Sequence, residues 1–514
     1  MSRLLHLGEI VGINARLYPD KVAARASARA LTFRQWHERA CRLANALLAL
    51  PLAKGDRVAV LAHNALEWLE IYAAVANAGL AMVPINFRLV GREIRYIVEN
   101  CEARAIIVGH DLVDRTEGIR ADLPIPPPNY VVFGGAATPA GYKSYEDIIA
   151  AASAAEPAVE VLPQDLFALI YTSGTTGNPK GAMRSHASLA LSNYATLLAF
   201  GFRPDDSCLL VMPLCHANSL FFAAAFAATG AASCVYDRRS VDPEHLLRTL
   251  ASERVTFTSL VPTHYVMMLG LPERVRAACN VEAVTRLLVS SAPVRRETKL
   301  AILEQFPRSG LYELYGSTEA GWVTMLRPEE QLTRLASIGR ELFGSGPIRL
   351  LDETGGEVAE GQPGELFSRT PWAFEGYWKE PAKTAQAFRG PYLSVGDMAR
   401  RQEGYYYLVD RKSNMIISGG ENVYPSEVEA VLGAHPKVKD VAVVGRPHDT
   451  WGEAVHAVIV LREGESATEA EVLAWCTQRI AGYKRPKSVS FIRDEDMPRT
   501  ATGKIQHRLL KGRY

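Results

Sequence analysis

The sequence lacks the usual signatures of a membrane, disulfide-bonded or zinc-binding protein. Its seven cysteines form no C-x-x-C pair, so neither a zinc site nor a disulfide framework is indicated, and a reducing compartment is the simplest expectation. The most apolar stretch, 219–235, is interrupted by glycine and hydroxyl residues, which predicts a buried helix rather than a membrane span. Glu9, Asn14 and Arg16 interrupt the N-terminal segment before a signal-like apolar core develops. We therefore expect a cytoplasmic protein without a transmembrane segment.

The sequence also lacks an excess of charge of either sign. Lys and Arg total 57 against 56 for Asp and Glu, a net charge of +1. Such a chain has no overall field to attract nucleic acid or an acidic membrane, which favours a small-molecule ligand. Hydrophobic residues make up 48% and charged residues 22% of the 514 positions, the balance of a globular protein with a large core. This length exceeds one ordinary compact domain and predicts at least two.

Short apolar runs alternate with helical patterns through most of the chain. Residues 56–64 have the pattern of a buried strand, 65–79 of a helix, and 82–86 of the next strand. Strand-to-loop units recur at 255–262 and 285–293. Alternation of this kind predicts an α/β fold in which helices cover parallel sheets.

The pattern changes after about residue 340. Residues 346–369 contain short apolar runs separated by Gly-rich turns, as in hairpins or a small barrel. From about residue 411 a mixed α+β pattern follows, long enough for a separate small domain. A domain boundary is therefore expected near residue 410.

Residues 171–181, YTSGTTGNPKG, have the composition of a phosphate-binding loop. They follow an apolar strand, their small residues let backbone N–H groups converge on an anion, and Lys180 adds charge. The stretch is not a Walker A loop, because Pro179 precedes the lysine and Gly181 follows it, so the hydroxyl that would bind magnesium is missing. On composition alone, a polar surface turn is an equally good interpretation.

Seven stretches, taken in order, resemble the motifs of the adenylate-forming superfamily: acyl- and aryl-CoA ligases, adenylation domains and luciferases. They are YTSGTTGNPKG (171–181), PLCHANS (213–219), YELYGSTEAG (312–321), GELFSRTPWAFEGYW (364–378), SVGDMA (394–399), GYYYLVDRKSNMIISGGENVYPSEVE (404–429) and PRTATGKIQ (498–506). The resemblance covers nearly the whole chain. It implies two parallel-rich sheets and a small β-barrel in a large N-terminal domain, 1–410, and a small mobile α+β domain, 411–514.

The resemblance further implies an acid–CoA ligase that uses ATP, Mg²⁺ and coenzyme A to convert a carboxylic acid into its acyl-CoA, AMP and pyrophosphate. Tyr315 would stack on adenine beside Gly316, Thr318 would contact the α-phosphate, and the Glu319 carboxylate would help hold Mg²⁺, which prefers oxygen ligands. The residues assigned to the β- and γ-phosphates are Thr172, Ser173, Gly174, Thr175, Thr176 and Lys180.

Further residues receive roles by the same resemblance. Asp397 would accept both ribose hydroxyls, Arg411 would support the same nucleotide, and Lys504 would neutralise the charge that develops between carboxylate and α-phosphate. The residues assigned to the pantetheine tunnel are Ser418, Gly419 and Gly420, where glycine permits close approach of a thin ligand. The hinge position is either Ser413 or Lys412, since the Asp or Lys usual two residues after the arginine is here a serine.

His216 in PLCHANS corresponds to the gate between ATP and the acyl pocket, although an isolated histidine is more often a core residue. Asn218 and Ser219 could hydrogen-bond a polar substrate, and a packed loop with satisfied polar groups explains them equally well.

The resemblance also bears on the size of the acid. Acetate-specific members carry a tryptophan at the position of Gly316, so the glycine is expected to leave that space open. Trp322 and Phe221 could shorten the pocket. This predicts an aryl, branched or medium-chain acid, larger than acetate.

Other functions remain to be distinguished. A stand-alone adenylation enzyme loading a carrier protein, or a luciferase-like oxygenase, would share the first step. A non-catalytic nucleotide-binding regulator would not need Lys504, Glu319, Asp397 and Arg411 together. The expected partner is a small carboxylic acid, with no nucleic acid, and a homodimer is the assembly considered.

Overall fold

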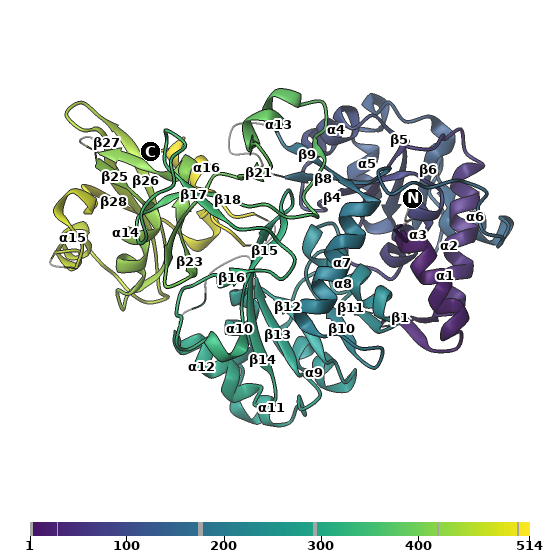
Figure 1. The fold of residues 1–514 in the computed structure, drawn as a ribbon, viewed down its shortest axis with the longest axis horizontal. Coiled ribbons are helices and arrows are strands. Elements are labelled where there is room, and N and C mark those ends of the chain that lie inside the picture. Colours follow the sequence, from purple (N-terminus) through teal and green to yellow (C-terminus); the bar gives the residue numbers. More distant parts are fainter. Residues whose placement is uncertain are drawn as a thin grey trace. The chain divides into compact units, whose positions relative to one another are not determined.

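The computed structural model describes residues 4–27, 29–172, 178–290, 294, 296–418, 421–477, 479–500 and 503–514. The chain forms two compact units (Figure 1). The first comprises Met1–Pro347 and Arg369–Leu393, and the second comprises Ile348–Ser368 and Ser394–Tyr514. The predicted boundary near residue 410 separates the part of the chain that is expected to move as a domain, residues 411–514. This boundary stays a prediction.

A nine-stranded sheet forms one layer of the first unit. The neighbouring strands β14, β13, β12, β10, β11 and β1 run parallel, so their carboxyl ends meet at one edge of the sheet. The edge strand β2 runs antiparallel to β1. In order across the sheet the strands are β16 (Arg340–Glu341), β15 (Gly321–Leu326), β14 (Gly310–Ser317), β13 (Arg286–Ser290), β12 (Phe257–Leu260), β10 (Ser207–Leu210), β11 (Ala232–Val235), β1 (Val22–Ala26) and β2 (Arg29–Thr32).

An eight-stranded sheet forms a second layer of the same unit. It is parallel from β8 to β7, and β9 and β19 extend it antiparallel. In order the strands are β19 (Gly376–Tyr377), β9 (Lys180–Ser185), β8 (Leu166–Thr172), β4 (Ala81–Ile85), β3 (Arg57–Leu61), β5 (Ala103–Gly109), β6 (Tyr130–Phe133) and β7 (Lys143–Ser144). The prediction of an α/β fold with two parallel-rich sheets is confirmed.

The largest hydrophobic core lies between these sheets. It contains apolar side chains of both sheets and of the helices α1 (Leu7–Leu17), α2 (Phe33–Leu48), α3 (Glu67–Asn77), α7 (His186–Phe200) and α8 (Ala217–Thr229). The outer face of the nine-stranded sheet is covered by α9 (Pro243–Ser252), α10 (Pro262–Leu269) and α12 (Arg296–Gln305). The outer face of the other is covered by α4 (Gly91–Asn100) and α5 (Val113–Glu117).

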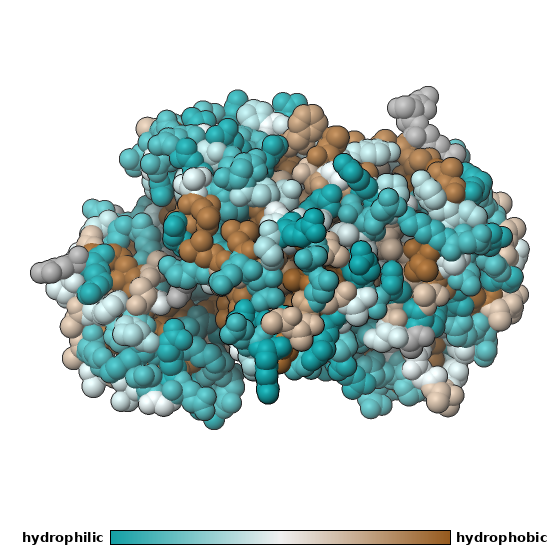
Figure 2. All heavy atoms as spheres, turned by 90° about the horizontal axis from the view of Figure 1, so that it is seen from below, coloured by the Kyte–Doolittle hydropathy of each residue, from teal (hydrophilic) through white to brown (hydrophobic). Residues whose placement is uncertain are grey.

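Helix α8 is the apolar stretch that predicted a buried helix. Its side chains from Ser219 to Ala227 are buried, and it ends at Gly230, whose φ of 70° suits glycine at a helix C-terminus. None of the described helices combines the length and the apolar character needed to cross a membrane. The surface seen in Figure 2 is mostly hydrophilic, with hydrophobic side chains in separate patches.

The described residues of the second unit form two sheets. The hairpins predicted after residue 340 form a four-stranded antiparallel sheet of β17 (Arg349–Leu351), β18 (Gly364–Phe367), β22 (Asp397–Gln402) and β23 (Tyr405–Arg411). A five-stranded sheet follows, made of β25 (Glu421–Val423), β24 (Ile416–Ser418), β27 (Gly452–Leu461), β26 (Val438–His448) and β28 (Ser488–Phe491). Apolar side chains of α14 (Pro425–Gly433) and α15 (Glu469–Trp475) form a core with this sheet, and Leu510 of α16 (His507–Lys511) belongs to another.

Candidate active site

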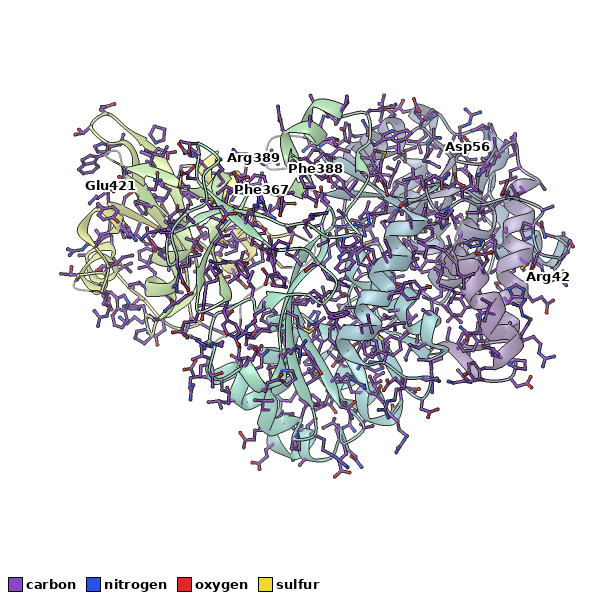
Figure 3. The ribbon with its side chains drawn as sticks, in the orientation of Figure 1. Arg42, Asp56, Phe367, Phe388, Arg389 and Glu421 are labelled. Carbon is purple, nitrogen blue, oxygen red and sulfur yellow. The ribbon has the colours of Figure 1, made fainter. Side chains whose placement is uncertain are left out.

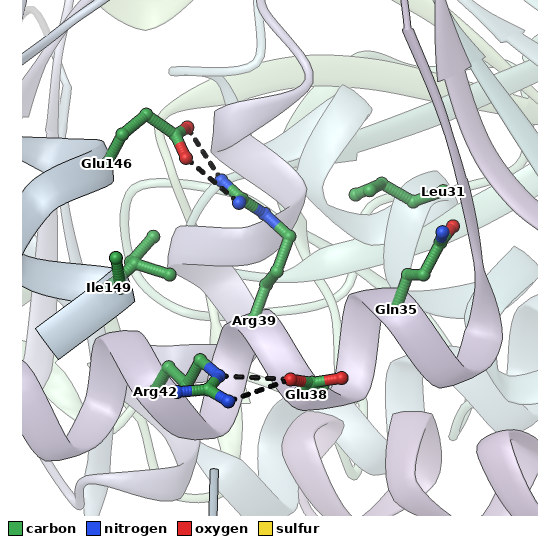
Figure 4. A pocket seen from close by; sticks show the side chains of 8 residues that line it. Leu31, Gln35, Glu38, Arg39, Arg42, Glu146 and Ile149 are labelled. Atoms are coloured by element: carbon green, nitrogen blue, oxygen red, sulfur yellow. Dashed lines mark hydrogen bonds and ion pairs between the residues drawn. The ribbon is translucent and has the colours of Figure 1, made fainter. Parts of the chain in front are cut away.

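Two surface hollows of the first unit lie outside the predicted motifs. The first, of about 290 Å³, is lined by α2 and α6 (Tyr145–Ala151). Its charged groups pair with one another, since Arg39 binds Glu146 and Arg42 binds Glu38 (Figure 4). The second, of about 560 Å³, includes Asp56 in its lining. Figure 3 labels Arg42 and Asp56, one from each hollow. Neither hollow contains a residue of the seven motifs, so we do not assign the chemistry to them.

The hairpin of β8 and β9 brings two predicted phosphate-binding residues to one place. Thr172 and Lys180 are paired in the ladder across the hairpin. The Thr172 hydroxyl donates to Glu319 Oε1 at 3.4 Å, and the Tyr377 hydroxyl donates to the same oxygen at 2.9 Å. Lys180 Nζ lies 4.1 Å from the centre of the Tyr377 ring. The structure therefore places a hydroxyl, a cation and a carboxylate beside the start and the end of the predicted phosphate loop.

The remaining predicted loop residues, Ser173, Gly174, Thr175 and Thr176, lie outside the described residues.

The charges at this place act on each other. Burial lowers the pKa of Lys180, and the Glu319 carboxylate opposes that shift. Glu319 is only 7% exposed, and the two hydroxyls that donate to it compensate for part of the lost water. An anionic ligand with bound cations would complete such a set of groups.

Arg184 on β9, which lies outside the seven motifs, supports the turn that carries Glu319. Its Nη1 donates to the carbonyl oxygens of Thr318 and Glu319, both at 3.3 Å, and its Nη2 donates to the Ser192 hydroxyl at 3.2 Å. Arg184 is 1% exposed and lies over the ring of Phe221, 5.0 Å from its centre. Burial lowers the pKa of Arg184 to about 10, so the guanidinium is still charged at neutral pH.

Tyr315 and Gly316 lie near the end of β14, where the pairing with β15 shifts register between them. A Cβ atom on Gly316 would lie 2.2 Å from the carbonyl oxygen of Gly321 and 3.2 Å from the Cα of Trp322. The direction of a side chain at position 316 is therefore filled by backbone of β15. The expectation that Gly316 leaves open space is wrong, and glycine is needed here for the close approach of two strands.

Trp322 and Phe221 form a continuous aromatic wall in the first unit. Their rings meet edge to face with centres 5.4 Å apart. The Trp322 indole N–H donates to the Thr196 hydroxyl at 3.0 Å, and Trp372 donates to the Trp322 carbonyl at 3.0 Å. These bonds fix the orientation of Trp322. Its effect on the length of an acyl pocket stays a prediction.

His216 stands immediately before α8. Its Nε2 is buried and has no hydrogen-bond partner within the described part of the chain. Burial, and then the charge of Arg88, lowers the pKa of His216 to about 4, so the imidazole is neutral at pH 7. The Ser219 hydroxyl donates to the Met212 carbonyl at 2.6 Å, which shows that Ser219 has a packing role.

The second unit holds the remaining predicted residues. Asp397 and Arg411 are partners across β22 and β23, and Arg411 Nε donates to Asp397 Oδ1 at 3.1 Å. Lys504 interacts electrostatically with both of them. Ser418 ends β24 and pairs with Glu421, while Gly419 and Gly420 between them lie outside the described residues.

The two hinge candidates lie directly after β23. The Lys412 ammonium donates to Glu365 at 3.0 Å, and its backbone N–H donates to the Gly396 carbonyl at 2.8 Å. Ser413 follows in the same single turn of 3₁₀-helix.

Two family models match the chain. A model of the AMP-binding enzyme matches residues 13–378, and a model of the AMP-binding enzyme C-terminal domain matches residues 427–504. The chain belongs to the AMP-binding enzyme family. These are the adenylate-forming enzymes that the seven motifs resemble, and the prediction of this superfamily is confirmed.

Members of the family similar to this chain act on different acids. Indoleacetate–CoA ligase of Aromatoleum aromaticum is 33% identical over 510 residues, covering 98% of this chain and 97% of that protein. A long-chain-fatty-acid–CoA ligase of Mycobacterium tuberculosis is 33% identical over 491 residues, covering 94% and 93%. The solved structure of an anthranilate CoA ligase with anthranoyl-AMP has a TM-score of 0.88 at 27% identity, covering 100% and 97%. Family membership therefore establishes the reaction class and leaves the acid open.

Two residues of the site had no role in the sequence analysis. Tyr377 lies inside a quoted motif, and only the folded chain shows that its hydroxyl reaches Glu319. Arg184 gave one usable signal, because a charged residue follows Gly-Ala-Met in a strand that directly continues the phosphate motif. A buried strand rarely carries an arginine unless it is paired.

Proposed function

We propose that this chain activates an aryl, branched or medium-chain acid, larger than acetate, as its acyl-adenylate. The chain is an AMP-forming acid–CoA ligase that uses ATP and coenzyme A. A carboxylate oxygen attacks the α-phosphorus of ATP and pyrophosphate leaves, and then the CoA thiolate attacks the acyl carbon and AMP leaves. The observation that supports the adenylation step is the meeting of Thr172, Lys180 and Glu319 beside the predicted phosphate loop.

ATP is expected to bind as its magnesium complex. Glu319 supplies a buried carboxylate, and hydroxyl oxygens of Thr172 and Tyr377 lie next to it, so the group fits a hard cation that is bound mainly by phosphate oxygens. Among the described residues, no group of three or more His, Cys, Asp and Glu side chains is placed to hold a metal ion. We therefore treat Mg²⁺ as part of the nucleotide substrate, with Glu319 as its protein ligand.

The phosphate loop and the β14–β15 turn would share the adenylation step. Lys180 and the 172–176 segment hold the departing pyrophosphate, Thr318 contacts the α-phosphate, and Tyr315 with Gly316 borders the adenine. Phosphoryl transfer depends mainly on positioning and on stabilisation of charge. Arg184 serves positioning, because it donates to the backbone carbonyl groups of Thr318 and Glu319.

The second unit would supply the remaining groups. Arg411 orients Asp397 for the ribose hydroxyls, and Lys504 neutralises charge between carboxylate and α-phosphate. We propose that residues 411–514 move as a domain about Ser413 or Lys412, so that the 418–420 loop replaces Lys504 for attack by CoA. Adenylation that survives unchanged in Lys504→Ala would contradict this assignment.

The size of the acid rests on the aromatic wall and on the relatives. Trp322 and Phe221 offer apolar area suited to a ring or a chain of intermediate length. Turnover of acetate comparable to that of six- to ten-carbon acids would contradict the proposal.

The products of the reaction show whether CoA is the acceptor of the acyl group. Acid-dependent release of AMP is expected to continue only with CoA present, with acyl-CoA found by mass spectrometry. An enzyme that loads a carrier protein would form acyl-adenylate and no acyl-CoA.

We also propose a homodimer, which light scattering would test, and a cytoplasmic location, consistent with seven cysteines that are all free and buried.

A further inference from the structure

The inner faces of β12 and β13 change from apolar to polar at their carboxyl ends. Phe257 and Leu288 belong to the core between the sheets. Two residues further along the same faces stand Ser259 and Ser290, which are 5% and 6% exposed. β12 pairs with β13, and β13 pairs with β14, which leads into the Glu319 turn. The two hydroxyls thus lie at the sheet edge that carries the nucleotide motif, where α/β sheets bind their ligands.

Asn218 in the first turn of α8 connects the two serines. Its Nδ2 donates to Ser259 Oγ at 3.1 Å and to Ser290 Oγ at 3.3 Å, and the two hydroxyl oxygens are 3.4 Å apart. The bonds leave Asn218 Oδ1 buried with no hydrogen-bond partner in the described part of the chain. Buried polar atoms are nearly always paired. The carbonyl oxygen of this amide is therefore available to accept a hydrogen bond from a ligand.

Two histidines extend the same polar region. His264 on α10 has a buried Nδ1, and His216 a buried Nε2, without partners among the described residues. Burial and then Arg88 lower the pKa of each to about 4, so both rings are uncharged at neutral pH. In the chain, His216 stands two residues before Asn218, and His264 stands five residues after Ser259. Buried polar atoms are seldom left unpaired, so three such atoms in the segments around Asn218 and Ser259 indicate a site for a polar group of a ligand.

The geometry points to an acid that carries an uncharged hydrogen-bond donor, such as a hydroxyl, an amine or a ring N–H, remote from its carboxylate. This donor binds Asn218 Oδ1, and the serine pair holds the amide in the required orientation. The inference rests on the proposed acid–CoA ligase function and deepens it, because it separates donor-bearing acids from plain hydrocarbon acids. A site built to bind a donor strongly rejects the analogue that lacks it.

The test uses matched acids and acid-dependent exchange between pyrophosphate and ATP. The pairs are 4-hydroxycinnamate with cinnamate, 2-aminobenzoate with benzoate, and indole-3-acetate with naphthalene-1-acetate. 4-Methoxycinnamate serves as an acid with an acceptor only. We expect at least a tenfold higher kcat/KM for the donor-bearing acid in one or more pairs, and no such gain for the methoxy acid.

Variants assign the preference to its residues. In Asn218→Leu, the ratio of kcat/KM for the donor-bearing acid to kcat/KM for its matched analogue is expected to fall to about one. If Asn218→Leu does not fold, Ser290→Ala is used instead, and it should also lower this ratio. Thr258→Val is the matched control, since Thr258 is buried beside Ser259 on the opposite face and donates to the Leu209 carbonyl. It should leave the ratio unchanged.

Equal kcat/KM within every pair, a preference for the methoxy acid, or a preference that persists in the folded variants would overturn the inference while the ligase function stands. Absence of exchange with every acid would instead overturn the proposed function.

Discussion

Replacement of Arg184 by methionine tests whether the turn that carries Glu319 is held by one buried cation. The guanidinium donates to two carbonyl groups of this turn. Hydrogen bonds from a charged donor contribute about 1.5–3 kcal/mol each, whereas burying the charge costs several kcal/mol. The terms nearly cancel, so the free energy of unfolding should change by less than about 2 kcal/mol.

Activity should respond much more strongly than stability. Without its two bonds the Glu319 carboxylate is free to shift, and a displacement of about 1 Å in a catalytic group costs about 100-fold. We expect kcat for adenylation to fall about 10- to 100-fold, equivalent to about 1.4–2.7 kcal/mol of transition-state stabilisation.

Arg57→Met is the matched control. Arg57 also donates to backbone carbonyls, those of Gly55, Cys101 and Glu102, and lies over the Trp378 ring, but it belongs to β3. Its replacement should leave kcat within about twofold. Pyrophosphate exchange measures kcat for adenylation in both variants, and thermal unfolding measures their stability. An unchanged kcat in Arg184→Met, or equal losses in the two variants, would refute the reasoning.

Three further predictions follow from individual contacts. Lys504→Ala should lower acid-dependent pyrophosphate exchange at least about 100-fold and leave acyl transfer from synthetic acyl-adenylate to CoA within a few-fold; equal losses in both steps would contradict the assigned role. Gly316→Ala places a Cβ against the Gly321 carbonyl, so we expect a lower melting temperature, by about 1–3 kcal/mol of stability, and less turnover of every acid; a stable variant that gains acetate would contradict this. Burial lowers the pKa of His507, but the hydrogen bond to Glu429 at 2.6 Å, the charges of Glu429 and Asp410 and a backbone hydrogen bond together raise it above its ordinary value of 6.5. The stability that the His507–Glu429 pair contributes is therefore fully present below about pH 6.5 and is lost as pH rises through the higher pKa of His507 in the folded protein. The melting temperatures of wild type and His507→Gln should converge with rising pH. A constant difference would contradict the pairing.

The sequence predicted those parts of the molecule in which local pattern and motif agree. Alternating apolar runs predicted the two parallel-rich sheets, and the interrupted stretch 219–235 correctly predicted a buried helix. Seven motifs in order predicted the family. These features depend on short-range periodicity and on exact strings of residues, which a single sequence contains in full.

Contacts between distant segments could not be read in the same way. Gly316 was interpreted as open space, and the structure shows the backbone of β15 there, because a register shift between strands has no signature in residue type. Arg184 and Tyr377 approach Glu319 from segments far away in the chain. The link from Asn218 to Ser259 and Ser290 depends on the parallel alignment of β12 and β13, which only the folded chain brings about.

The fate of a labelled carboxylate oxygen tests the central claim most directly. An acid that supports exchange is labelled with ¹⁸O in its carboxylate and converted in the presence of ATP, Mg²⁺ and CoA. Adenylation followed by thioester formation transfers one labelled oxygen to the phosphate of AMP, and mass spectrometry should find it there. Label in inorganic phosphate, or unlabelled AMP alongside acyl-CoA, would contradict an acyl-adenylate intermediate.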